Sequence, residues 1–321
     1  METLRKAIEP YNKVFFLVCM HLTLLPFITP AIALFMGLAY ALILGNPMPK
    51  LAKKSSKYLL QVAVVFLGFG MNLHQSIASG KEGMMFTIIS VFSVMIIGYF
   101  IGKLIKVDSK TSYLISSGTA ICGGSAIAAV APIVKANDNQ ISVALGTVFI
   151  LNAIALFIFP PIGHWLGMTQ EQFGEWAAIA IHDTSSVVGA GEAYDSTYFP
   201  GCESIALQVA TLIKCTRALW IIPLALITAL IFREKNSKVS IPWFILFFVL
   251  AMIANTYLNI PHSITSKIVW LAKKGLCMTL FLIGSGLSLS VLKSVGIKPL
   301  ILGVILWAII AVLSLTVILL I

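Results

Sequence analysis

Two basic residues lie deep inside one apolar stretch and are the strongest candidates for chemistry in this chain. Lys214 follows Ser204 by ten residues, about 15 Å along a helix, which is near the middle of a bilayer. Polar side chains on this stretch recur every three residues and so share one face. They are Gln208, Thr211, Lys214 and Arg217. Two buried cations need negative partners, so their excess predicts a bound anion.

A second candidate cluster surrounds a single acidic residue. It consists of His182, Asp183, Thr184, Ser185 and Ser186. A charged residue within a span normally faces the bundle interior or a water-filled cavity, and a histidine can carry a proton near neutral pH. Two simpler interpretations stay open: the cluster is wetted at the outer interface, or Asp183 pairs with Arg217 and leaves Lys214 neutral.

A glycine-rich stretch between residues 116 and 126 predicts a broken helix. Its candidate binding residues are Thr119, Cys122, Gly123, Gly124 and Ser125. Each glycine costs about 1 kcal/mol relative to alanine inside a helix, and free backbone groups at such breaks bind ions or substrates. A weaker candidate for a second break is Gly284, Ser285 and Gly286. For the stretch 116–126, the alternative is a close packing face between helices.

The composition predicts that the elements carrying these residues lie in a membrane. Of 321 residues, 59% are hydrophobic and 11% charged, and the mean hydropathy is +0.99. Such a chain cannot bury its apolar surface in one soluble core, so we expect a single integral membrane domain over residues 1–321. The basic residues sit in the joints between apolar stretches, which favours a lipid partner and excludes nucleic acid. The five cysteines are scattered, and neither a metal site nor a disulfide frame is indicated.

Eleven apolar stretches predict an all-α polytopic bundle of about 11 transmembrane helices. They run over 14–28, 30–46, 58–78, 84–106, 111–135, 141–166, 173–191, 204–232, 242–259, 270–292 and 298–321. If every stretch crosses, fifteen Lys and Arg residues fall on the side of the amino terminus and five on the other, together with an acidic joint at 192–203. Because these cations resist translocation, the amino terminus is predicted to be cytoplasmic.

A short internal echo predicts inverted repeats. Residues 67–73 and Gly80 match residues 283–289 and Gly296 at a constant offset. In the span count above, the two segments cross in opposite directions, as an inverted-topology repeat requires.

Three motifs resemble the YeiH family of bacterial inner-membrane proteins. They are residues 118–129, residues 181–190 and the Lys214-Cys215-Thr216-Arg217 element, in the same order and spacing. That family is labelled as sulfate exporters and is grouped with the fold of bile acid/sodium symporters and sodium/proton antiporters. The resemblance implies two inverted repeats with discontinuous crossing helices, the first lined by residues 122–125, and an inner-membrane location. It leaves open whether 181–191 or 283–289 supplies the second crossover.

The combined expectation is a secondary active transporter that moves a small, sulfate-like or organic anion by alternating access. It has no cofactor, its coupling ion is H⁺ or Na⁺, and a homodimer is compatible with the pattern. Three alternatives are a transporter of a different small solute, a channel, and a membrane-embedded enzyme that uses Cys122, His182 and Asp183. The last lacks any recognisable catalytic motif.

Overall fold

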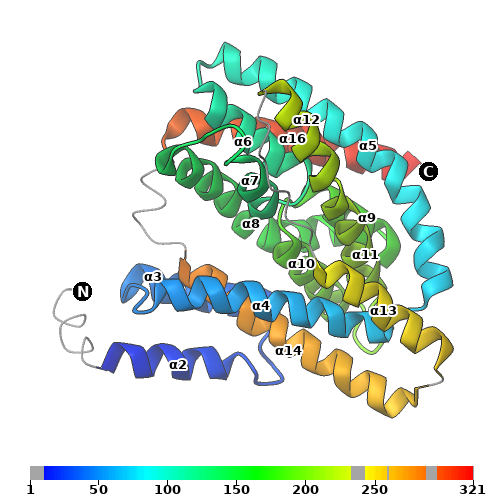
Figure 1. Ribbon diagram of the computed structural model, residues 1–321. Coiled ribbons are helices and arrows are strands. Elements are labelled where there is room, and N and C mark those ends of the chain that lie inside the picture. Colours follow the sequence, from blue (N-terminus) through cyan, green and yellow to red (C-terminus); the bar gives the residue numbers. More distant parts are fainter. Residues whose placement is uncertain (1–10, 233–242, 259, 287–294, 321) are drawn as a thin grey trace.

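The computed structural model describes residues 11–232, 243–258, 260–286 and 295–320, and its regular elements in these ranges are helices (Figure 1). In chain order they are α2 (Asn12–Leu22), α3 (Pro30–Ile43), α4 (Pro49–Leu67), the 3₁₀ turn η2 (Gly68–Gly70), α5 (Leu73–Leu104), α6 (Ser109–Ala120), α7 (Gly124–Val130), α8 (Asp138–Trp165), α9 (Gln170–Ala180), α10 (Thr184–Tyr198), α11 (Ile205–Leu219), α12 (Ile221–Ile231), α13 (Trp243–Tyr257), α14 (His262–Gly286) and α16 (Ile297–Leu320). The prediction of an all-α membrane bundle is therefore confirmed.

In the described part of the chain, five helical segments are long and apolar enough to cross a membrane. They are Thr87–Leu104, Asp138–Trp165, Ile205–Ile231, His262–Gly286 and Ile297–Leu320. Shorter apolar helices are α2, α3 and α13. Each of the eleven apolar stretches overlaps at least one helix, but stretch 58–78 runs from α4 across η2 into α5, which begins at Leu73.

Local sequence signals explain where several helices begin. Pro30 and Pro49 stand at the first positions of α3 and α4, where a missing N–H costs nothing. Capping boxes start α8 at Asn137 and α9 at Thr169. The carboxylate of Asp108 caps α6 by accepting from the Thr111 backbone N–H.

The first discontinuous stretch turns back on itself instead of crossing. Lys110, at the start of α6, donates a hydrogen bond of 2.8 Å to the carbonyl of Lys135, beyond the end of α7. Twenty-five residues that crossed the membrane would hold these groups about 30 Å or more apart. We call residues 109–135 the first hairpin. Its base is also tied by Gln140, which donates to Asp108 at 2.8 Å.

Neighbouring groups at this base determine the pKa of Asp108. Partial burial acts to raise the pKa of the Asp108 carboxyl, but hydrogen bonds from Thr111 and Gln140 outweigh it and lower the pKa below its usual value.

The second discontinuous stretch is also a hairpin, formed by residues 170–198. Gln170, at its start, donates to the carboxylate of Asp195 at 2.6 Å, and the Tyr194 hydroxyl donates to the Met168 carbonyl at 2.7 Å. The rings of Phe173 and Tyr194 stack between the two arms, with centroids 3.9 Å apart. The prediction that stretches 111–135 and 173–191 both cross is therefore wrong, because a polypeptide that breaks its helix at mid-depth can reverse there.

The two hairpins enter from opposite ends of α8. This helix has 28 residues and is about 42 Å long. The first hairpin ends just before it and the second begins just after it. Each hairpin is followed by a long helical segment, α8 or α11–α12, so the two hairpin-plus-helix units have inverted topology.

The remaining helices form a second layer beside the hairpins. In Figure 1, α2, α3, α4 and α14 lie together as one layer, with α13 at its edge. A small core of Phe16, Tyr40, Ala52 and Phe281 joins them. A separate cluster that includes Leu67, Val188, Leu207 and Leu276 connects this layer to α10 and α11. The second hairpin therefore lies along the boundary between the layers.

Close helix approaches support the internal echo. Gly68, at the end of α4, packs against the backbone of α13, and Gly284, near the end of α14, packs against the backbone of α3. Thus α4 and α14 occupy equivalent places in the two halves of this layer. Residues 287–289 of the echo lie outside the described part of the chain. The two hairpins correspond to each other as inverted elements. A simple inverted repeat of five apolar stretches followed by five more therefore does not describe this chain.

The weaker candidate break is not a break in the described residues. The α14 helix continues through Gly284, Ser285 and Gly286. A side chain at Gly284 would collide with the carbonyl of Leu34 and the amide of Leu38. The glycine instead serves close packing of α3 on α14. The second discontinuity is instead at residues 181–183.

Candidate functional site

The tips of the two hairpins meet. Gly123 at the first tip has a positive φ of 63°, and a Cβ built on it would lie 3.4 Å from the Cα of Asp183 at the second tip. The positive φ favours glycine at this tip, and the 3.4 Å separation places the two tips in van der Waals contact. The broken helices predicted from the two glycine-rich and polar motifs thus form one site.

A side chain from the middle of α8 holds the second tip. The Asn152 Oδ1 atom accepts hydrogen bonds from the backbone N–H groups of His182, at 3.0 Å, and Asp183, at 3.3 Å. Asn152 lies half-way along α8, which fixes the tips at about the middle of the membrane. Asn152 is a single polar residue in an apolar stretch, and such a residue is typically a hydrogen-bond partner between helices; here it has that role at the second tip.

Asp183 begins the helix α10. Its carboxylate accepts from the Ser185 N–H at 3.1 Å and from the Ser185 hydroxyl. A carboxylate at this position also compensates the positive end of the helix dipole. Asp183 keeps partial exposure, whereas His182 beside it is fully buried. The two neighbours therefore have different environments.

Lys214 binds the end of α9. Its Nζ donates to the carbonyl of Ile181 at 2.7 Å and to that of Ala178 at 3.2 Å. The side chain is completely buried. A cation at a helix carboxyl end satisfies carbonyls that have no partner within the helix and opposes the negative end of its dipole.

Arg217 binds the end of α6 in the same manner. Its Nη2 donates to the Ala120 carbonyl at 2.6 Å, and its Nη1 donates to the Ser90 hydroxyl at 3.0 Å. Within the described ranges, neither Arg217 nor Lys214 forms an ion pair with Asp183. The predicted alternative of an Asp183–Arg217 pair is therefore not present, and each cation instead holds one hairpin at its break.

The charges at the tips do not cancel. The carboxyl ends of α6 and α9 each carry roughly half a negative charge, and the amino ends of α7 and α10 carry roughly half a positive charge each. Because these four partial charges sum to about zero, the formal charges decide the balance. With all three side chains ionised, Lys214 and Arg217 face one carboxylate, that of Asp183, and one positive charge is in excess.

Several buried polar atoms near the breaks make no hydrogen bond to the described part of the protein. They are the Thr119 Oγ1, the Asn152 Nδ2, both ring nitrogens of His182 and the Arg217 Nε. Buried polar groups are normally paired, because an unpaired one costs about 1–3 kcal/mol. Atoms left unsatisfied at the meeting point of two broken helices are characteristic of a ligand site.

The structure brings most of the predicted binding residues to the tips. Thr119, Cys122, Gly123, His182, Asp183, Lys214 and Arg217 surround the meeting point, and Thr184, Ser185 and Ser186 form the buried first turn of α10. Two members differ: Gly124 is half-buried against α8, and Ser125 is exposed on the outer face of α7. Gly284, Ser285 and Gly286 belong to the other layer. The described residues contain no cluster of side chains suited to a metal ion.

Sequence comparison gives the family. A family model described as Conserved hypothetical protein 698 matches residues 15–303. The chain belongs to this family. The YeiH resemblance fits this membership, and the fold relation to bile acid/sodium symporters and sodium/proton antiporters stays a prediction.

Three bacterial relatives, each named a UPF0324 membrane protein, are similar to this member of the Conserved hypothetical protein 698 family over most of its length. The protein from Bacteroides thetaiotaomicron is 63% identical over 88% of this chain and 84% of its own. Those from Porphyromonas gingivalis and Photobacterium profundum are 57% and 48% identical, over 92% and 98% of this chain and 88% and 94% of their own. No solved structure matches. The shared description supports a multi-pass membrane protein.

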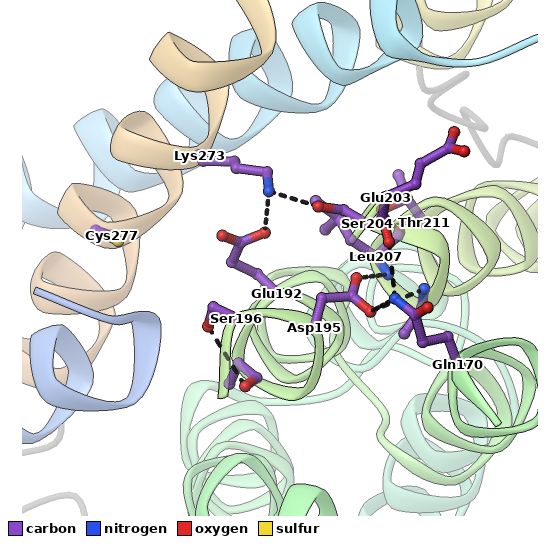
Figure 2. A network of polar contacts seen from close by, with 12 residues as sticks. Gln170, Glu192, Asp195, Ser196, Glu203, Ser204, Leu207, Thr211, Lys273 and Cys277 are labelled. Atoms are coloured by element: carbon purple, nitrogen blue, oxygen red, sulfur yellow. Dashed lines mark hydrogen bonds and ion pairs between the residues drawn. The ribbon is translucent and has the colours of Figure 1, made fainter. Parts of the chain in front are cut away.

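A polar network that sequence reasoning placed in a loop lies instead on α10 and is shown in Figure 2. Glu192 pairs with Lys273 of α14 at 2.8 Å, and Lys273 also donates to the Ser204 hydroxyl at 2.7 Å. Asp195 is buried and accepts from the backbone of Leu207 at 2.9 Å. The acidic residues were expected in a joint at 192–203. Instead, α10 continues to Tyr198, so Glu192 and Asp195 lie on this helix inside the protein.

The sequence signals that could have identified Glu192, Asp195 and Ser90 differ in strength. Glu192 and Asp195 are three apart, the spacing of one helix face, and this periodicity could have placed them on a helix. Ser90, which binds Arg217, is one of several serines in an apolar stretch, and its sequence context does not distinguish it.

Proposed function

We propose that this chain is a secondary transporter that carries a small anion across the membrane by alternating access. The observation that supports the proposal best is the pair of oppositely inserted hairpins, whose tips meet beside two buried cations and one carboxylate. An uncompensated buried charge is costly, so an anion that binds there is stabilised by the excess. The location consistent with the family resemblance is a bacterial inner membrane with a cytoplasmic amino terminus.

The hairpins also offer a way into the site from each side of the membrane, which such a transporter needs. Each reaches the same point from a different side, so opening either one exposes the site to one compartment only. We therefore assign the substrate to the tips and the gating to the hairpin arms. Coupling to H⁺ or Na⁺ provides the driving force.

An embedded enzyme is less well supported. Both ring nitrogens of His182 lack a hydrogen-bond partner among the described residues, so His182 does not hold the Cys122 thiol in a nucleophile–base pair. The structure offers no observation that favours catalysis over transport.

The proposal is tested by uptake of labelled sulfate into proteoliposomes, after a thermal-shift screen against sulfate, sulfite, small carboxylates and sodium has ranked the ligands. Lys214→Gln removes the charge excess and is expected to weaken anion binding about ten- to a hundredfold. Asp183→Asn keeps a good helix cap but enlarges the excess, so it is expected to tighten binding. Effects of opposite sign are the signature of a charge-controlled site.

Lys110→Gln is the matched control, because Lys110 also donates to a backbone carbonyl but lies at the base of the first hairpin. It should leave sulfate affinity unchanged. Thermal midpoints of all variants in detergent report folding separately from binding. Unchanged anion affinity in both Lys214→Gln and Asp183→Asn would remove the anion from the proposal.

A further inference from the structure

His182 is the largest unexplained polar group at the tips. Its backbone N–H is used by Asn152, but its ring is fully buried and both ring nitrogens lack a partner in the described residues. The Asn152 Nδ2 atom, from the side chain that holds His182, is also unsatisfied. A buried imidazole that the fold does not use for structure is available for a proton.

The charged groups around His182 oppose its protonation while the site is empty. Lys214 and Arg217 of α11 both interact electrostatically with it. Asp183 follows it in the chain, and Cys122 of the first hairpin interacts electrostatically with Asp183 and Lys214. Imidazolium would be a third cation against one carboxylate in a medium of low dielectric constant, so the ring is neutral.

A bound anion reverses this balance. The empty site has one excess positive charge, which a monovalent anion neutralises by itself. A divalent anion instead leaves one excess negative charge. One proton added to the ring of His182 then makes the occupied site neutral.

We infer that His182 takes up one proton from water when a divalent oxyanion binds at the hairpin tips, so that the proton travels with the dianion. One N–H bond forms on the imidazole, and one O–H bond breaks in the hydronium ion that supplies the proton and becomes water. This inference rests on the proposed function and names both its coupling ion and its substrate class. Because binding linkage is reciprocal, proton and dianion each strengthen the binding of the other.

Calorimetry on the purified full chain tests the inference. Sulfate and methanesulfonate are the probes, because they share an oxyanion head but carry two and one negative charges. Titration in two buffers of different ionisation enthalpy measures the protons taken up for each anion bound. We expect about one proton for sulfate and close to none for methanesulfonate, and sulfate affinity that falls about tenfold for each pH unit above neutrality.

His182→Gln replaces the ring with a neutral polar side chain. It should still bind sulfate, but without proton uptake and with a flat pH profile. Asp183→Asn leaves two excess positive charges, which sulfate neutralises by itself, so proton uptake with sulfate should fall towards none. Sulfate binding by the unaltered chain without proton uptake, or uptake that persists in His182→Gln, would overturn the inference while leaving anion transport intact. If neither anion binds, the proposed function fails and the inference fails with it. Comparing proton uptake with sulfate and with methanesulfonate on the unaltered chain tests the inference even if a variant does not fold.

Discussion

At the scale of single residues, the site depends on side chains that do two things at once. Lys214 and Arg217 each satisfy the carbonyls at the end of a half-helix and also provide positive charge at the tips. Asp183 caps α10 and supplies the one nearby carboxylate. Gly123 contributes by having no side chain, because its backbone at φ 63° and ψ −123° is one that only glycine adopts readily.

Gly123→Ala is therefore expected to destabilise the protein. Backbone strain costs about 1–3 kcal/mol, and the new Cβ would lie 3.2 Å from Val148 and 3.4 Å from Asp183. Gly124→Ala is the control, since its φ is negative and its Cβ would meet only the movable ends of Leu145 and Phe149. Thermal midpoints in detergent should fall clearly more for the first variant. Equal midpoints would show that the tip tolerates a side chain.

At the scale of elements, the important result is that the two broken helices reverse direction. Hydrogen bonds between Lys110 and the Lys135 carbonyl, and between Gln170 and Asp195, join the two ends of each hairpin. This moves Lys135 to the side of Lys110, so the predicted distribution of basic residues becomes sixteen to four instead of fifteen to five. The hairpins therefore strengthen the charge asymmetry on which the orientation prediction rests.

Cysteine labelling distinguishes hairpins from crossings. In a background without other cysteines, Lys110→Cys and Lys135→Cys should react with a membrane-impermeant maleimide from the same side, which the charge rule predicts to be cytoplasmic. Glu171→Cys and the native, exposed Cys202 should react together from the opposite side. Labelling in whole cells and in inverted vesicles separates the two sides. Reaction of positions 110 and 135 from different sides would contradict the first hairpin.

At the scale of the whole molecule, two layers meet along the second hairpin. The layer of α2, α3, α4 and α14 contacts α10 through an apolar cluster and through the Glu192–Lys273 ion pair (Figure 2). If one layer moves against the other during transport, this boundary must slide, and an ion pair that spans it must break or change partners. A cross-link across this boundary should therefore block the proposed alternating access.

Glu192→Cys combined with Lys273→Cys places one thiol on each side of the boundary. The replaced side chains are long, so a bifunctional methanethiosulfonate reagent is used to bridge the two thiols. Cross-linking should abolish anion uptake into proteoliposomes, and a reducing agent should restore it, because the cross-link holds the layers in one arrangement. Each single cysteine variant, treated with the same reagent, is the control. Full uptake by the cross-linked protein would mean that the layers do not separate at this point.

The sequence by itself determined the membrane class, the number and approximate position of the apolar elements, and the residues that carry charge or break helices. These properties are local: they follow from composition, from helix length and from the cost of glycine and of buried charge. That is why Gly123, Asp183, Lys214 and Arg217 could all be named from the printed chain.

Only the tertiary structure decided how those residues are used. Whether a broken helix crosses or turns back depends on what its two ends meet, and those partners are 25 residues apart at both hairpin bases. The same holds for the partners of Lys214 and Arg217, which are carbonyls of distant half-helices, and for Gly284, which packs on α3 instead of breaking α14. Contacts between segments far apart in the chain have no local signal, because a hydrogen-bonding or packing group is the same in the sequence whichever partner it finds.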